Sequence, residues 1–276
     1  MKVTIGCDPE LFAHDGKQIV SAHTLTKGTK DKPVALGRKG HMIQADGFAV
    51  EFNAPVVEMD LLDPHSQSLA RTQFWNTISH ANLNISKLFS KNKLRISNTS
   101  LVEIPKDIYD KAPKGTKELG CDPDFNAWTG DVNERPDALT LMRAAGGHVH
   151  VGWGEDFDIE DPVHFNTCCE LTKQLDFTLG LASVIYDKAG VSRRKYYGKA
   201  GAFRPKSYGL EYRALSNYWI FSEMYTKNII SHTAKALKDF LDGNKYEEIY
   251  GDIQAAINDG NENFAYNFFN ERGVRY

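Results

Sequence analysis

The sequence predicts an α+β protein in which amphipathic helices pack on a largely antiparallel β-sheet. Three long segments place apolar residues at helical spacing. Several shorter segments have the composition of strands. The strand-like and helical segments do not alternate regularly, as they would in a doubly wound parallel sheet, so that architecture is not expected.

Helices are predicted at residues 63–88, 161–186 and 222–243. The first two start with an Asp-Pro pair, in which the aspartate caps the helix and the proline takes its first position. The third is expected to stop at Gly243, because glycine commonly follows the last residue of a helix. A shorter helix is predicted at residues 247–257.

The predicted strands are short and lie between the helices. They cover residues 2–5, 18–21, 48–52, 56–59, 148–151 and 210–215. Two long segments rich in Gly, Lys and Pro, residues 24–40 and 105–136, are read as loops. Connections of this length are usually binding loops or lids, so we expect both to serve a site.

Length and charge limit the possible classes of protein. A chain of 276 residues forms one large domain or two small ones, and no clear linker divides it. We expect one domain over residues 1–276, with the sheet in about 1–220 and C-terminal helices in about 221–276. The net charge of −3 argues against general affinity for nucleic acids or membrane surfaces.

The sequence also indicates a cellular compartment. No apolar run is long enough to cross a bilayer, and the N-terminal segment reads as a strand rather than a signal peptide. The four cysteines, Cys7, Cys121, Cys168 and Cys169, form no Cys-x-x-Cys pair. We therefore expect core cysteines and a cytoplasmic location rather than a zinc ribbon or a disulfide framework.

Four pairs of polar residues share an i, i+2 spacing, which aims both side chains of a strand at one face. The pairs are Asp8 and Glu10, Glu51 and Asn53, His148 and His150, and Glu211 and Arg213. Any one pair could simply face water, as polar residues of antiparallel sheets often do. The same spacing of polar residues on four predicted strands favours a shared site. Carboxylates with a single imidazole suit Mg²⁺ or Mn²⁺ better than zinc.

The segment from Tyr197 to Arg213 combines basic side chains with one carboxylate. Lys199, Arg204 and Lys206 precede Glu211. An acid that holds a divalent cation beside an arginine that holds a phosphate indicates magnesium-nucleotide chemistry, although a surface ion pair on an edge strand is the alternative. Because the sequence has no P-loop or dinucleotide-binding glycine motif, a nucleotide would be held by a sheet and its loops.

Four motifs together resemble the phage-associated carboxylate–amine (COOH-NH2) ligases, or amidoligases, of the glutamine synthetase and glutamate-cysteine ligase fold. They lie at residues 6–12, 46–53, 146–152 and 204–217. The resemblance implies a curved, largely antiparallel sheet, as in the catalytic domain of glutamine synthetase. It also implies that ATP and two or three divalent cations bind its concave face. ATP would phosphorylate a carboxylate, and an amine would attack the acyl phosphate to give an amide.

The resemblance assigns roles residue by residue. It implies metal ligands at Asp8, Glu10, Glu51, His148 and Glu211, and catalytic roles for Arg204, Glu211 and Arg213. With the basic segment described above, we expect nucleotide binding by Lys199, Arg204, Lys206 and Arg213. The chain has Asp8-Pro9-Glu10 where many relatives have Glu-x-Glu, so the division of ligands between metal ions stays open. His150 ranks below His148 as a ligand.

Substrates and partners follow from the same resemblance. The implied substrates are a small carboxylate (an amino acid, peptide or related metabolite) and an amine, with a possible homo-oligomer and a host-cytoplasmic location if the protein is phage-encoded. The basic loop with Lys27, Lys30, Lys32, Arg38 and Lys39 could close over ATP or an acidic substrate, or be a solvated loop. Asp122, Asp124 and Asp131 could attract the amine or serve turns.

Two other functions stay open from the sequence. A zinc-dependent hydrolase would use His148 and His150 and would act without ATP. A non-catalytic phage protein would have kept the same fold for binding.

Overall fold

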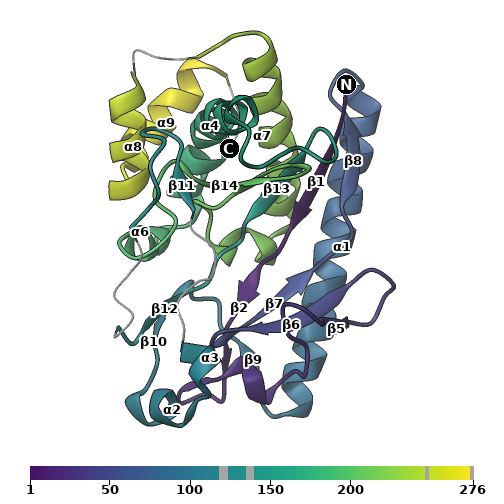
Figure 1. Ribbon diagram of the computed structural model, residues 1–276, viewed down its shortest axis with the longest axis vertical. Helices are drawn as coiled ribbons and strands as arrows, with labels where there is room; N and C mark the ends of the chain where they lie inside the picture. Colours follow the sequence, from purple (N-terminus) through teal and green to yellow (C-terminus); the bar gives the residue numbers. More distant parts are fainter. Residues whose placement is uncertain (118–123, 135–139, 246–248, 274–276) are drawn as a thin grey trace.

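The computed structural model describes residues 1–117, 124–134, 140–245 and 249–273, and it confirms the α+β prediction with antiparallel sheets. In Figure 1 the largest sheet and the C-terminal helices occupy one end of the molecule, and the smaller sheets occupy the other. The long helix α1 (Pro64–Lys91) runs beside both ends.

The largest sheet has six strands, and every neighbouring pair is antiparallel. In spatial order they are β11 (Phe125–Asn126), β14 (Ala202–Lys206), β15 (Gly209–Tyr212), β13 (Val149–Gly152), β1 (Lys2–Cys7) and β8 (Val57–Asp60). The register places Gly6, His150, Glu211 and Arg204 in one row across four strands. The sheet therefore gathers residues that are nearly 200 positions apart.

The smaller sheets are built from short strands. A four-stranded sheet has the order β2 (Glu10–Leu11), β7 (Ala49–Asn53), β6 (Met42–Asp46) and β5 (Val34–Ala35). A three-stranded sheet contains β4 (Ile19–Val20), β3 (Ala13–His14) and β9 (Arg95–Ile96), and a pair is formed by β10 (Leu101–Glu103) and β12 (Met142–Ala144).

The chain passes from the largest sheet to the four-stranded sheet at Asp8-Pro9. Pro9 lacks the N–H group that a ladder requires, so β1 ends before it. The backbone N–H of Glu10 then donates to the carbonyl of Gly146 (2.9 Å). As a result Asp8 stays with one sheet and Glu10 enters the other.

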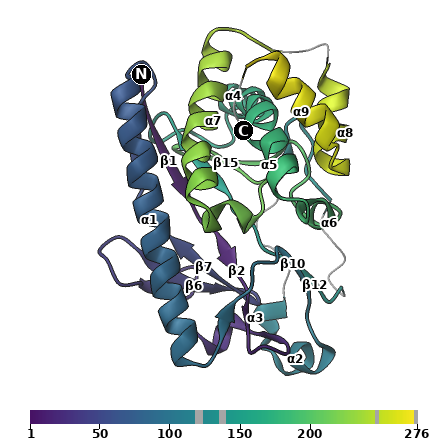
Figure 2. The same cartoon turned by 180° about the vertical axis from the view of Figure 1, so that it is seen from behind.

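Three long helices form one packed group in which the last contacts the other two, and Figure 2 shows the first and the last running beside each other. They are α1, α4 (Pro162–Leu175) and α7 (Glu223–Leu241), and all three confirm the predicted positions. Asp63 and Asp161 accept hydrogen bonds from the N–H groups of His65 and Val163, as expected for N-caps. The core between helices and sheet includes Phe74 stacked on Trp219, with ring centroids 5.8 Å apart.

The remaining helices are shorter. After α4, a π-helical turn (Asp176–Gly180) leads into α5 (Leu181–Tyr186), and α6 (Gly190–Arg194), α8 (Tyr250–Asp259) and α9 (Glu262–Glu271) complete the C-terminal end. Two 3₁₀ turns lie at Ala22–Thr24 and Asn217–Phe221. The helix predicted at 247–257 corresponds to α8, although the predicted first residues, 247 and 248, lie outside the described residues. None of the described helices is long and apolar enough to cross a membrane.

Parts of the loop predictions are wrong. The segment 105–136 contains α2 (Lys106–Lys111), α3 (Lys114–Lys117) and β11, and the segment 24–40 contains β5. These elements are two to six residues long, too short for hydrophobic periodicity to show them. As predicted, Cys7, Cys168 and Cys169 are buried and free, whereas Cys121 lies outside the described residues.

Candidate active site

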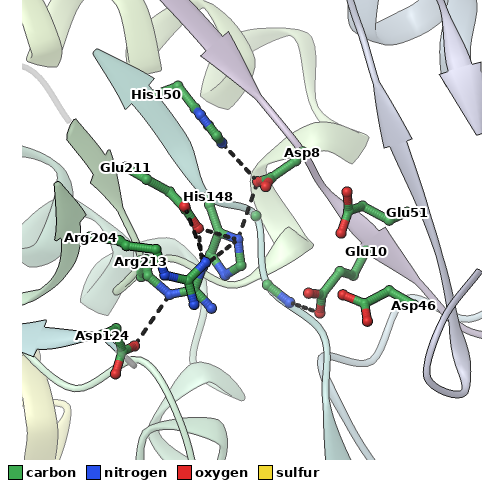
Figure 3. A network of polar contacts seen from close by, with 12 residues as sticks. Asp8, Glu10, Asp46, Glu51, Asp124, His148, His150, Arg204, Glu211 and Arg213 are labelled. Atoms are coloured by element: carbon green, nitrogen blue, oxygen red, sulfur yellow. Dashed lines mark hydrogen bonds and ion pairs between the residues drawn. The ribbon is translucent and has the colours of Figure 1, made fainter. Parts of the chain in front are cut away.

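The first cluster of site residues lies on the largest sheet. Asp8 follows β1, His148 immediately precedes β13, and Glu211 is on β15. The Nδ1 atom of His148 is 3.1 Å from Oδ1 of Asp8 and 3.4 Å from Oε1 of Glu211. Figure 3 shows these three side chains pointing toward one another. The structure therefore brings together three of the predicted metal ligands from three separate motifs.

His150 lies against the same carboxylate. Its Nε2 atom is 3.2 Å from Oδ1 of Asp8, and its Nδ1 atom contacts the hydroxyl of Tyr208. Burial would raise the pKa of Asp8, but the attraction of His150 and His148 outweighs it and holds that pKa well below its ordinary value. Asp8 is therefore charged and could offer an oxygen to a cation, and His150 contacts it from the side.

Of the two ring nitrogens of His148, only Nδ1 faces the carboxylates. Burial and the nearby Arg213 lower the pKa of His148, so the ring is neutral and able to bind a metal. Its Nε2 atom is buried without a hydrogen-bond partner among the described residues. A Cβ atom on Gly146 would lie 2.2 Å from that Nε2 atom. Gly146 thus allows the ring to sit with Nδ1 aimed at the carboxylates.

The second cluster lies on the four-stranded sheet and consists of Glu10, Asp46 and Glu51. Glu10 on β2 is directly opposite Glu51 on β7, and Asp46 is at the end of β6. One carboxylate oxygen from each lies within 4.8 Å of the other two. Asp46 is the first residue of the 46–53 motif and was not among the metal ligands predicted from the sequence. Its signal is a position two residues beyond Gln44, which pairs with Glu51 across the sheet.

The environment of this cluster disfavours three negative charges. Burial, followed by Asp46, raises the pKa of Glu10 to about 7. Burial and the carboxylates of Asp8, Asp46 and Glu10 raise the pKa of Glu51 well above its ordinary value. Two donors hold the carboxylates in place: the N–H of Gly146 to Glu10 (2.8 Å) and Nε2 of Gln44 to Glu51 (2.7 Å).

Basic side chains surround Glu211. Nζ of Lys206 is 2.8 Å and Nη1 of Arg204 is 3.4 Å from Oε2 of Glu211, and Arg213 contacts the other oxygen, Oε1. Arg204 is directly opposite Glu211 across β14 and β15. The carboxylate of Glu211 thus contacts His148 of the first cluster on one side and three cations on the other. This arrangement is suited to a metal-bound phosphate.

Arg213 has further partners that were not predicted from the sequence. Its Nε atom pairs with Oδ2 of Asp124 (3.2 Å), and its guanidinium contacts the hydroxyl of Tyr197. The buried Arg193 donates to the backbone carbonyl of Ala214 (3.1 Å) and so supports the strand end. The available signal for Arg193 was an arginine pair shortly before Tyr197.

Other predicted residues lie outside this network. Lys199 is exposed, and within the described part of the chain its ammonium group forms no ion pair, so its nucleotide role stays a prediction. Lys30 reaches Asp46 (3.1 Å). The carbonyl of Asp131 pairs with Asn126 in a turn, and Asp122 lies outside the described residues. A role of these acids in amine binding stays a prediction.

The donor sets fit divalent cations such as Mg²⁺ or Mn²⁺. Five of the six side chains in the two clusters offer carboxylate oxygens, and one offers an imidazole nitrogen. The buried carboxylates of Glu10 and Glu51, with their raised pKa values, are groups that a cation would stabilise.

Comparison with known proteins adds a family to this geometry. Residues 142–273 match the family model described as phage phiEco32-like COOH.NH2 ligase-type 2. This match covers slightly less than half of the chain and shows that these residues are similar to the COOH-NH2 ligase family. The resemblance inferred from the four motifs is thereby confirmed, and the family name denotes enzymes that join a carboxylate to an amine.

Other comparisons are more distant. A solved structure described as apo GmaS without ligand is similar over 100% of this chain and 70% of that chain, with 10% sequence identity and a TM-score of 0.41. No curated protein matches the chain.

The family match and the geometry cover different parts of the site. The match in the COOH-NH2 ligase family includes His148, Arg204, Glu211 and Arg213. The carboxylates of Asp8, Glu10, Asp46 and Glu51 come from the first sixty residues, outside the match. The matched region therefore contains only some of the candidate metal ligands, and the fold brings the others close to them.

Proposed function

We propose that this protein is an ATP-dependent carboxylate–amine ligase that forms an amide through an acyl phosphate. The observation that carries the proposal is the position of Glu211. It lies 3.4 Å from the imidazole of His148 on one side and contacts Arg204, Lys206 and Arg213 on the other. A metal-ligand cluster and a phosphate-binding cluster thus share one carboxylate.

Two groups of residues would hold divalent cations. Asp8, His148 and Glu211 form one, and the acids of the second cluster form the other. Bound cations would neutralise the phosphate oxygens and the carboxylate substrate, which otherwise repel one another. The chain itself fixes these ligands through the N–H of Gly146 and the amide of Gln44.

The basic residues would act on the moving phosphoryl group. Arg204, Lys206 and Arg213 point at the same carboxylate from β14 and the end of β15. Such donors stabilise the charge that develops on the transferred oxygens. The bond from the γ-phosphorus to ADP breaks, and a bond from it to a carboxylate oxygen of the substrate forms. The amine then attacks the acyl carbon, and phosphate leaves with that oxygen.

Two alternatives are weaker. A zinc hydrolase would be expected to use both histidines as ligands, but His150 directs its Nδ1 atom to Tyr208 and lies outside the compact cluster of the described residues. A binding protein without activity would have little need for a carboxylate held between a histidine and three cations.

The function is tested by incubating the protein with ATP, Mg²⁺ and a panel of amino acids, short peptides and amines. Phosphate release and mass spectrometry of products are the measurements. We expect phosphate release and a product of amide mass only when acid, amine, ATP and Mg²⁺ are all present. Hydrolysis without ATP but with Zn²⁺ would support the hydrolase instead. Absence of both turnover and a thermal shift with ATP and Mg²⁺ would contradict the ligase.

A further inference from the structure

A buried carboxylate lies behind the phosphate-binding strands. Asp176 has no exposed surface and is the first residue of the π-helical turn between α4 and α5. The N–H of Leu181 donates to the carbonyl of Asp176 across this turn. Turns of this kind are rare and are often found at functional sites. Asp176 faces away from the substrate side, so its role must be exerted through other residues.

Three hydrogen bonds connect Asp176 to the strands that carry the site. The hydroxyl of Tyr212 donates to Oδ1 (2.6 Å), and Nε1 of Trp128 donates to Oδ2 (2.7 Å). The backbone N–H of Gly201 is the third donor. One carboxylate thus holds β15 through Tyr212, the start of β14 through Gly201, and the turn after β11 through Trp128.

The strand geometry makes these contacts relevant to the site. Tyr212 lies between Glu211 and Arg213, and side chains of a strand alternate between its two faces. Holding the Tyr212 hydroxyl from behind therefore fixes how far Glu211 and Arg213 project in front. Gly201 comes three residues before Arg204, so its N–H fixes the start of the strand that carries that arginine.

Two glycines, Gly180 and Gly201, leave the space around the Asp176 carboxylate that a larger side chain would fill. A Cβ atom on Gly180 would lie 2.7 Å from the Tyr212 hydroxyl and 3.2 Å from Oδ1 of Asp176. A Cβ atom on Gly201, whose φ is +77°, would lie 2.4 Å from Cδ1 of Trp128. Both glycines leave the space in which the donors reach Asp176. A buried carboxylate with no such purpose would be costly to keep.

We propose that Asp176 is a positioning residue of the ligase, whose carboxylate sets the relative placement of Arg204, Glu211 and Arg213 by holding Tyr212, Gly201 and Trp128 from the back of the sheet. This inference rests on the proposed ligase function for its kinetic test. It goes beyond that function because Asp176 touches neither the metal-ligand clusters nor the phosphate-binding side chains in the structure.

The test compares Asp176→Leu, Asp176→Asn and the wild type at a temperature where circular dichroism shows each to be folded. We expect Asp176→Leu to lower kcat by about tenfold or more, because small displacements of catalytic groups are costly. Its affinity for Mn²⁺, measured by calorimetry, should fall because Glu211 is displaced. Asn can accept from Trp128 and donate to the Tyr212 oxygen, so Asp176→Asn should recover most of both values.

A matched control separates positioning from stability. Asp239 is another largely buried carboxylate, paired with Lys235 within α7 (2.8 Å). Asp239→Leu should lower the melting temperature while leaving kcat and Mn²⁺ affinity unchanged. If folded Asp176→Leu behaves in the same way, the proposal is overturned.

Two further outcomes are decisive. If Asp176→Leu does not fold, Tyr212→Phe removes one hydroxyl only. A fall of several-fold in its kcat supports the proposal, and an unchanged kcat overturns it. If the wild type shows no turnover, the ligase function is contradicted. The positioning role of Asp176 is then tested by comparing the Mn²⁺ affinities of the wild type and Asp176→Leu. Weaker Mn²⁺ binding by Asp176→Leu then supports positioning, and equal binding overturns it.

Discussion

Glu10 on β2 and Glu51 on β7 are directly opposite each other in an antiparallel pair, and Asp46 completes the cluster. Like charges in this relationship are destabilising. The raised pKa values of both glutamates reflect burial and this repulsion. A cation between the carboxylates would reverse the effect, so the cluster costs stability in the metal-free protein and gains it on metal binding.

Replacing Glu51 should therefore have opposite effects on stability and on metal binding. Glu51→Gln keeps a side-chain oxygen that can accept from Gln44 and removes one charge. We expect a melting temperature in EDTA equal to or above that of the wild type, and a smaller rise on adding Mg²⁺. Differential scanning fluorimetry measures both. Glu58→Gln, at an exposed position on β8, is the control and should change neither. A lower melting temperature in EDTA for Glu51→Gln would contradict the electrostatic argument.

Two lysines of the same segment should differ in their importance. Lys206 contacts Glu211 (2.8 Å), whereas Lys199 is exposed in the preceding turn. Lys206→Gln should raise the KM for ATP by about tenfold, since a charged contact to phosphate is lost. Lys199→Gln should leave the KM for ATP near the wild-type value. Equal effects of both variants would contradict this difference and support the nucleotide-binding role predicted for Lys199 from the sequence.

The space that Gly146 leaves beside His148 should be essential for metal binding and turnover. A Cβ atom on Gly146 would overlap Nε2 of His148, so Gly146→Ala must displace the imidazole from Asp8 and Glu211. We expect weaker Mn²⁺ binding and a kcat lowered by about 10². Gly115→Ala is a suitable comparison because no atom lies within 4 Å of the added carbon. Unchanged Mn²⁺ affinity in Gly146→Ala would remove His148 from the ligand set.

Glu211 joins the metal side of the site to the phosphate side. Glu211→Gln keeps the shape of the side chain and removes the charge that attracts a cation, Lys206 and Arg213. We expect loss of turnover with retained fold, measured by phosphate release and circular dichroism. Mn²⁺ titration should show one site fewer than in the wild type. Retained turnover would exclude a role of Glu211 in metal binding.

Stability should depend on pH through His232. Burial, with a smaller effect of Lys235, lowers the pKa of His232 from 6.5 to about 4 in the folded protein. Between these values the unfolded chain binds a proton that the folded chain does not, so stability rises with pH in this window and is lost as pH falls from 6.5 toward 4. The loss amounts to about 3 kcal/mol.

This dependence is measured by denaturant unfolding at pH 7.5, 5.5 and 4.5. His232→Gln should be less stable than the wild type at pH 7.5 and should lose less stability on acidification. His65→Gln, at an exposed position on α1, should follow the wild-type profile. Parallel pH profiles for His232→Gln and the wild type would contradict the prediction.

The long helices and the paired site residues were predictable because their signals are local. Asp63-Pro64 and Asp161-Pro162 mark helix starts, and the i, i+2 pairs mark strand faces. His148 and Glu211 could be assigned to one site from these pairs and the family resemblance, and the structure brings them within 3.4 Å.

Residues whose role depends on the fold could not be found in this way. Asp46 joins Glu10 and Glu51 only through the register of β2, β7 and β6. Arg193 reaches the carbonyl of Ala214, and Asp176 accepts from Tyr212 and Trp128, and these contacts exist only in the folded chain. The short strands β5 and β11 are two residues long and are set by pairing with distant partners.

In the proposed reaction, a carboxylate is activated by phosphoryl transfer before an amine attacks it. The most direct measurement uses an acid substrate found in the screen, labelled with oxygen-18 in its carboxylate, with mass spectrometry of the released products. We predict ADP as the nucleotide product and one labelled oxygen in the released phosphate. Release of AMP carrying the label, or of phosphate without it, would contradict an acyl-phosphate intermediate.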